Sequence, residues 1–257
     1  MIQKIDFHIL QLESMKKYPK EIYYIGNIEL LKNPMVSIVG TRKPNNYTKL
    51  ITSQIAKKLS NNGVIVVSGA AMGVDAIAHQ NAQQNTIAVA ANGLDIQYPA
   101  INKNLISQIE KESLIISAYP PQSTAKAYTF VERNEIVVAL GDVLIVTQAD
   151  ANSGSLRSVE FALKMGKRVY TLPHRIGESE GTNRLLKEGL ATAIYDVDEF
   201  LEMLGYTNTS KPSSDEFIEF CKKNPTYDEA VDLYGAKVFE YELLGKILVT
   251  DGIVKLN

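Results

Sequence analysis

The chain has 257 residues, of which 45% are hydrophobic and 22% are charged, and its formal net charge is −2. This balance is typical of a globular protein that buries a sizeable core, and it excludes nucleic-acid binding through bulk positive charge, so any polyanion site must be a local basic patch. The single cysteine, Cys221, excludes an intramolecular disulfide and a cysteine metal cluster, and it fits a reducing cytoplasm.

Neither a targeting segment nor a metal site is apparent in the sequence. The first 20 residues lack the continuous apolar core and the cleavage site of a signal peptide, and no apolar run approaches the length of a membrane span. The three histidines lie too far apart to form a metal-ligand pattern. We therefore expect a cytoplasmic protein that uses no metal or other cofactor.

The predicted elements begin after a short, mixed N-terminal segment, residues 1–34, in which we expect only a small helix near residues 10–15 and no function. From there, largely apolar runs that suit buried strands, two of them (64–67 and 143–146) apolar without interruption, alternate with stretches of helical spacing. The predicted strands are 35–40, 64–67, 86–91, 114–117, 143–146, 169–172 and 193–195. The predicted helices are 47–62, one beginning at 74, 101–110, 128–140, 156–165, 184–188 and 196–204. This alternation predicts a doubly wound, mostly parallel α/β domain over residues 35–206.

The C-terminal part has a different composition. Residues 207–214 are polar with one proline and are predicted to be a linker. Three helices and a hairpin are predicted within residues 215–257, which suggests a winged-helix-like domain. Six lysines and nine acidic residues leave residues 211–257 with a net charge of −3, so this domain is a poor reader of DNA grooves and a protein-interaction or structural role is favoured.

A loop of small residues follows the second predicted strand and leads directly into a helix. It contains Ser68, Gly69 and Gly73. Such loops direct backbone N–H groups and the positive end of a helix toward an anion, although a tight turn without a ligand explains this loop alone equally well. The spacing matches neither the dinucleotide motif GxGxxG nor a P-loop, which removes most support for those functions.

Two further loops follow predicted strands. The first carries Thr41 and Arg42, and we expect Arg42 to bind a ligand rather than to remain a solvated loop charge, because ligands bind beyond the carboxyl ends of parallel strands and guanidinium groups suit phosphate. The second precedes a helix that carries Lys164. Its residues are Asn152, Ser153, Gly154 and Ser155. The small-residue loops are expected to face a shared anion groove.

The predicted helix 128–140 combines an aromatic ring with polar side chains. Phe130, Arg133 and Asn134 fall at spacings that share one helix face, and Lys126 precedes them. Single-stranded nucleic acid is held by such groups, because bases stack on rings and phosphates pair with positive charge. Taken alone, however, Phe130 is better interpreted as a core residue.

Together, these loops resemble the DprA/Smf family, the DNA-processing proteins of natural transformation. The matching pieces are VGTR at 39–42, SGAAMGVD at 68–75, GLD at 93–95 with YP at 98–99, Phe130 with RN at 133–134, SGSL at 153–156 and GTNRL at 181–185. They occur in the family's order across about residues 35–200, and the tail resembles the small winged-helix domain of some members. The resemblance implies an extended Rossmann-like fold, homodimers, single-stranded DNA binding that protects incoming strands, help in loading the RecA recombinase, and no enzymatic activity.

The resemblance also implies roles for individual residues. Thr41 and Arg42 would hold phosphate, Phe130 would meet a base, and Lys164 would add charge, whereas Lys126 is a looser match. The predicted DNA-binding residues are Thr41, Arg42, Ser68, Gly69, Gly73, Lys126, Phe130, Arg133, Asn152, Ser153, Gly154, Ser155 and Lys164.

The sequence departs from the family pattern at three positions. Glu135 stands where the family has arginine, and Ala118 and Gln148 stand where it has glutamate. Glu135 removes one positive contact, so we expect a lower affinity for DNA than the family pattern implies.

Two other functions compete with DNA binding. Phosphoribohydrolases that act on nucleoside monophosphates share the fold family and need a glutamate where this chain has Ser158. Glu160 would lie about 200° round the helix at roughly 100° per residue, so the required proton carrier is missing. A nucleotide-sensing module without a DNA role fits the loops, but it fits Phe130 and the basic residues less well.

Overall fold

The computed structural model describes residues 1–206 and 216–256. The chain separates into two compact units, Met1–Thr207 and Asn208–Asn257. The predicted linker 207–214 lies outside the described residues. Within the described ranges, no helix has the length and apolar character needed to cross a membrane.

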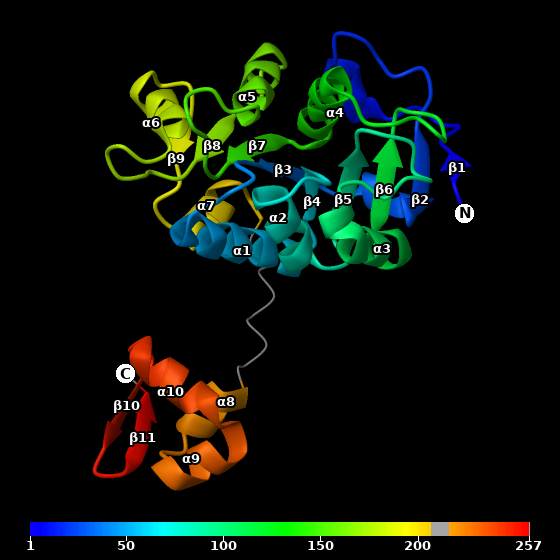
Figure 1. Ribbon diagram of the computed structural model, residues 1–257. Helices are drawn as coiled ribbons and strands as arrows, with labels where there is room; N and C mark the ends of the chain where they lie inside the picture. Colours follow the sequence, from blue (N-terminus) through cyan, green and yellow to red (C-terminus); the bar gives the residue numbers. More distant parts are fainter. Residues whose placement is uncertain (207–215, 257) are drawn as a thin grey trace. The chain divides into compact units, whose positions relative to one another are not determined.

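A nine-stranded sheet forms the centre of the first unit (Figure 1), in the order β1-β2-β6-β5-β4-β3-β7-β8-β9. All pairs from β6 across to β9 are parallel, whereas β1 and β2 pair antiparallel at one edge. The strands are β1 (Gln3–Lys4), β2 (Tyr23–Gly26), β3 (Met35–Val39), β4 (Ile65–Gly69), β5 (Thr86–Ala90), β6 (Leu114–Ser117), β7 (Val143–Val146), β8 (Val169–Thr171) and β9 (Thr192–Ala193). The predicted mostly parallel α/β fold is confirmed.

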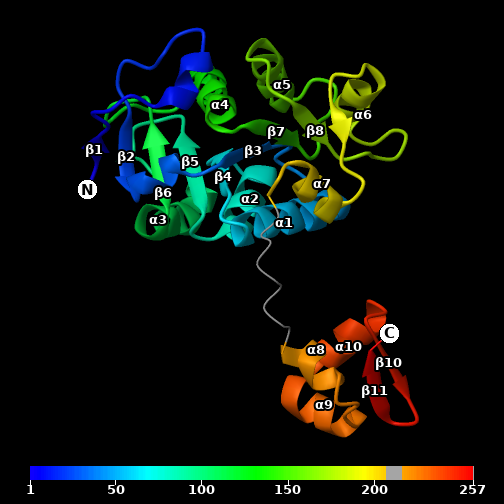
Figure 2. The ribbon, with the colours of Figure 1, turned by 180° about the vertical axis from the view of Figure 1, so that it is seen from behind.

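Helices cover both faces of this sheet (Figures 1 and 2). One face carries α1 (Asn46–Asn61), α2 (Val74–Ala82), α3 (Lys103–Glu112) and α7 (Val197–Met203). The other face carries α4 (Ala127–Leu140) and α5 (Ser155–Lys164). The remaining helical elements of this unit are η1 (Leu10–Ser14), η2 (Ile28–Lys32), η3 (Ala100–Asn102) and α6 (Glu180–Lys187).

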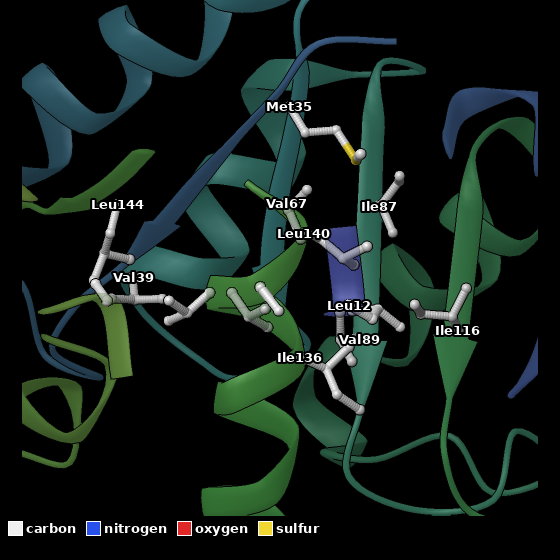
Figure 3. Packing of buried hydrophobic residues seen from close by; sticks show 14 of the residues in the cluster. Leu12, Met35, Val39, Val67, Ile87, Val89, Ile116, Ile136, Leu140 and Leu144 are labelled. Carbon is white, nitrogen blue, oxygen red and sulfur yellow. The ribbon is translucent and has the colours of Figure 1, made fainter. Parts of the chain in front are cut away.

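Side chains of the parallel strands alternate between two apolar cores. Met35 packs in the core under α4, and the next residue, Val36, packs in the core under α1 and α2. Figure 3 shows Ile136 and Leu140 of α4 among the side chains of the strands. Because both faces are covered, these strands are mostly apolar, and the polar residues within them, such as Ser37, are small and buried.

The N-terminal segment contributes more to the fold than the sequence predicted. We assigned no strand to residues 1–34, yet β2 pairs with β6 through Tyr24 and Ile116, and β1 extends the sheet further. Leu12 of η1 is fully buried in the core under α4. The four residues of β2 are only partly buried or exposed, and two of them are tyrosines, so the segment differs from the fully buried aliphatic runs of the central strands.

The second unit contains three helices followed by a hairpin, as predicted. These elements are α8 (Glu216–Cys221), α9 (Tyr227–Tyr234), α10 (Ala236–Leu243), β10 (Ile247–Thr250) and β11 (Ile253–Leu256). Asp251 and Gly252 join the two strands with positive φ angles of 52° and 74°, which suits the tight turn expected from this dipeptide. Phe217, Cys221 and Val238 are buried in the core of this unit.

Candidate nucleic-acid interface

A groove of about 830 Å³ lies at the carboxyl edge of the central strands. Because β4, β3 and β7 are adjacent and parallel, the loops that follow them meet at this edge. The predicted site residues that line it are Thr41, Arg42, Phe130, Arg133, Asn152, Ser153, Gly154 and Ser155. The loops after β3 and β7 therefore share one groove, whereas the small-residue loop after β4, which was predicted to share it, contributes only Ala71 to the lining.

The loop after β3 holds Arg42 at the groove through the backbone of Thr41. The Thr41 N–H donates to the Gln148 carbonyl at 2.9 Å, and the Thr41 carbonyl accepts the Val74 N–H at 3.1 Å. This fixes the loop between β7 and α2. The side chain of Arg42 is exposed, so its guanidinium is available to an anion.

The loop after β4 has a different role from the one expected. The Ser68 hydroxyl is buried and donates to the Ile38 carbonyl at 2.6 Å. A Cβ on Gly69 would lie 2.1 Å from Arg133 Nη1, and one on Gly73 would lie 2.4 Å from the Thr41 carbonyl oxygen. These three residues do not line the groove. They allow close packing beneath it.

A buried acid and a buried base lie beneath this loop. Asp75 and Arg133 are 7% and 5% exposed, and both approach the backbone of Gly69. Burial raises the pKa of Asp75, while the positive charge of Arg133 and a hydrogen bond from the Ala71 N–H oppose that rise. The Ala71 N–H is therefore bonded within the protein and is not free for a phosphate.

The guanidinium of Arg133 is likewise hydrogen-bonded within the protein. The sequence had predicted it as a DNA-binding residue, which would need an exposed guanidinium to contact a phosphate. Nη1 donates to the Val89 carbonyl and Nε donates to Asn134 Oδ1, both at 3.0 Å. The side chain thus joins α4 to the end of β5 and forms part of the groove floor. The sequence placed Arg133 on the correct helix face but could not reveal that its charge is buried.

Phe130 is half-buried and belongs to none of the apolar cores in the described residues, so the interpretation as a core residue was wrong. Its ring centroid lies 5.9 Å from the ring centroid of Tyr98 and 5.8 Å from Cζ of Arg42. A small cavity of about 50 Å³ lies next to the Phe130 ring. Phe130, Tyr98, Arg42 and Met72 are among the residues that line it. Tyr98 was recognised in the sequence only as part of a family motif.

The loop from β7 to α5 offers the free donors that the sequence predicted. Ser153 N–H donates to the Asp150 carbonyl and Ser155 N–H donates to the Ser153 hydroxyl, whereas the N–H groups of Asn152 and Gly154 have no acceptor among the described residues. Helix α5 begins directly afterwards at Ser155. Free N–H groups before a helix N-terminus are favourable for an anion.

Two further predicted residues, Lys126 and Lys164, are absent from the groove lining. Lys126 is exposed and caps the start of α4, and Lys164 is exposed in the last turn of α5. Other charged residues line the groove in their place. They are the bases Lys43 and Arg157 and the acids Asp75, Asp150 and Glu180. Lys43, Asp150 and Arg157 could have been identified as groove residues from the sequence, because each lies next to one of the loops that line the groove.

Comparisons with known proteins agree with this architecture. The family model of DNA recombination-mediator protein A matches residues 6–205. DNA processing protein DprA of Streptococcus pneumoniae is 36% identical over 199 residues, which cover 75% of this chain and 70% of that protein. Protein Smf of Synechocystis is 35% identical, and the match covers 73% of this chain and 49% of Smf.

Two solved structures are similar to the first unit. One is DNA processing protein A from Helicobacter pylori, reported for its unique single-stranded DNA binding mode, with a TM-score of 0.78, 39% identity, and coverage of 79% of this chain and 95% of that chain. The other is the X-ray structure of DprA from Streptococcus pneumoniae, with a TM-score of 0.73, 33% identity, and coverage of 78% and 74%. From its strand order, its groove motifs and these matches, the chain belongs to the DprA/Smf family, described as DNA recombination-mediator protein A.

Proposed function

We propose that the first unit binds single-stranded DNA without regard to base sequence. The observation that carries this proposal is the ring of Phe130, which lies outside the core and 5.8 Å from Cζ of Arg42 at the groove. A base can stack on the ring while a neighbouring phosphate meets the guanidinium, and neither contact depends on which base is present. The single-stranded DNA binding reported for the Helicobacter pylori relative supports the proposal.

The loop from β7 to α5 supplies a second phosphate contact in this proposal. The free N–H groups of Asn152 and Gly154 can each donate to a phosphate oxygen. Asp150 and Glu180 line the same groove and repel phosphates, so the attraction depends on a few cations. We therefore expect binding that weakens steeply as salt is raised.

The side chains favour a binding protein over a phosphoribohydrolase. Ser158 lines the groove where those enzymes need a glutamate, and Glu160 lies at the surface, where its carboxylate pairs with Arg157 at 2.8 Å. The buried carboxyl group in the groove, Asp75, is held by the Ala71 N–H and lies close to Arg133. The position at which those enzymes carry the glutamate therefore has a hydroxyl group, not a carboxyl group, in this chain.

The family membership supports a wider role for this protein. We propose that it acts in the cytoplasm in DNA recombination and natural transformation, that it protects incoming single strands and helps to load RecA, and that it forms a homodimer. These assignments follow from the resemblance of residues 35–200 to the DprA/Smf family.

A fluorescence-anisotropy titration with labelled oligo-dT, and with a duplex of the same length alongside, tests the DNA-binding function. At two salt concentrations, we expect salt-dependent binding of the single strand and a clear preference over the duplex. Tighter binding of the duplex would contradict the proposal. Absence of binding at low salt would also overturn it, and would favour the enzyme alternative, which predicts binding and hydrolysis of nucleoside monophosphates.

We further propose that the second unit binds an amphipathic helix with basic flanks on a partner protein. The exposed side of α10 presents Phe239 and Leu243, which are 63% and 72% exposed. At roughly 100° per residue, Glu242 and Glu240 lie on the two sides of this apolar pair. Carboxylates repel DNA phosphates, whereas they complement lysine and arginine beside the apolar stripe of a helical ligand.

A further inference from the structure

The carboxyl edge of the sheet carries a second hollow, which we name the Tyr47 hollow. Its volume is about 450 Å³, and it lies between the start of α1 and the loop after β8. Its lining includes Asn45, Tyr47, His174, Arg175 and Glu178.

Two hydrogen bonds attach the Tyr47 hollow to the strand end that also supports the groove. The Asn45 N–H donates to Gln148 Oε1 at 3.0 Å, and His174 Nε2 lies 2.8 Å from the Thr147 carbonyl oxygen. Thr147 and Gln148 follow β7 and lead into the loop that lines the groove. The linings of the two hollows are therefore adjacent along the chain, since Lys43 lines the groove, Asn45 lines the Tyr47 hollow and only Pro44 separates them in sequence.

The Tyr47 hollow repeats the combination of an aromatic ring and a guanidinium group. The Tyr47 side chain is 43% exposed, and its ring meets the His174 ring edge to face, with centroids 5.6 Å apart and an angle of 87° between the planes. Arg175 is exposed, and its guanidinium has no hydrogen-bond or ion-pair partner among residues 1–206 and 216–256. A ring held in position can stack on a base, and a free guanidinium can pair with a phosphate. The negative charge of Glu178 repels phosphate and offsets part of the attraction from Arg175. The hollow therefore suits one phosphate, placed at Arg175.

We propose that the Tyr47 hollow is a second nucleotide subsite on the single-stranded DNA path. A strand seated at Phe130 continues past residues 41–45, stacks one further base on Tyr47 and places a phosphate at Arg175. The subsite rests on the proposed DNA-binding function of the groove.

Oligonucleotide length separates the subsite from the groove. We would titrate the full chain with labelled oligo-dT of about 4 and about 15 nucleotides, which span the site sizes of single-strand grooves. Tyr47→Ala should weaken binding of the long oligonucleotide about 5-fold to 150-fold and leave the short one unchanged, because stacking contributes about 1–3 kcal/mol per base. Arg175→Ala should lower the salt slope for the long oligonucleotide by about one phosphate contact.

Matched variants complete the experiment. Tyr47→Phe keeps the ring and should bind as the wild type does, and Lys57→Ala removes an exposed charge from the same helix and should have little effect. The subsite alone would be overturned if Tyr47→Ala and Arg175→Ala both keep the wild-type affinity and salt slope while Phe130→Ala weakens binding. Equal weakening of the short oligonucleotide by Tyr47→Ala would also overturn it. Failure of the wild type to bind either length would instead refute the DNA-binding function.

Discussion

Phe130 can be tested separately from the core because its ring packs against Tyr98 and Arg42 rather than inside an apolar cluster. We predict that Phe130→Ala weakens single-strand binding by about 1–3 kcal/mol, the usual contribution of one stacked base. Its melting temperature should stay close to that of the wild type. Anisotropy titration and thermal denaturation of the same sample measure both effects. A large fall in melting temperature, with normal binding by the folded fraction, would show that the ring is structural.

Substitution of Arg42 tests directly whether a side chain of the groove contacts a phosphate. The Arg42 side chain is exposed, and the hydrogen bonds of Thr41 hold its loop in place. Arg42→Ala should weaken binding and lower the slope of log affinity against log salt by about one contact. Titrations at several salt concentrations measure the slope, with Lys57→Ala as the control. An unchanged affinity and slope would remove Arg42 from the site.

His79 links the stability of the first unit to pH. Its ring is buried beside Thr86 and the Gly69 carbonyl, and burial lowers its pKa to about 4. The unfolded chain binds a proton near pH 6.5 and the folded chain does not, so the stability that His79 contributes is present above pH 6.5 and is lost as the pH falls toward 4. The loss approaches about 3 kcal/mol at 1.36 kcal/mol per pH unit.

Urea denaturation at several pH values between 4 and 7 measures this dependence. In His79→Gln, the free energy of unfolding should fall less steeply with acid than in the wild type. Identical slopes for His79→Gln and the wild type would contradict the assignment.

At the scale of elements, two loops that look alike in sequence have different roles. Both are small-residue turns between a strand and a helix, and both were predicted to offer N–H groups to phosphate. The loop after β4 bonds its Ala71 N–H to Asp75, and its Met72 and Gly73, whose N–H groups have no acceptor among the described residues, lie outside the groove lining. The loop after β7 instead places its free Asn152 and Gly154 N–H groups in that lining. Local sequence could not separate them, because the burial of Asp75 depends on Arg133, which is 58 positions later in the chain.

Helix α10 is the element to test in the second unit. We predict that Phe239→Ser with Leu243→Ser leaves oligo-dT binding unchanged and abolishes binding of a synthetic helix whose leucine stripe has lysine flanks. The peptide titration uses the full chain, with isothermal calorimetry as the readout. Glu240→Lys with Glu242→Lys should reverse the preference toward a glutamate-flanked peptide, whereas Glu216→Lys with Glu219→Lys, an equal charge change on α8, should not.

Binding of the lysine-flanked peptide that persists after both apolar substitutions would exclude this face of α10. Self-association of the protein alone that requires Phe239 and Leu243 would also exclude a helical ligand, because a second copy of the chain would then cover the apolar pair.

For the whole molecule, hydrophobic patterning was sufficient to predict the fold. The central strands are covered on both faces, and their apolar runs therefore stand out from the helices between them. Edge strands carry no such signal, which is why β1 and β2 were missed. The sequence predicted that the loops after β3 and β7, with Arg42, lie at one groove. It did not predict the burial of Arg133 or the approach of Tyr98 to Phe130, since both depend on packing between distant segments.

The most direct test of the central claim uses a tryptophan at position 130. The chain contains no tryptophan, so Phe130→Trp introduces a single reporter at the groove. We predict that oligo-dT quenches its emission in a saturable, salt-dependent manner, with the affinity found by anisotropy, and that a duplex of equal length does so weakly. Single-strand binding that leaves the emission unchanged would contradict stacking of a base at this position.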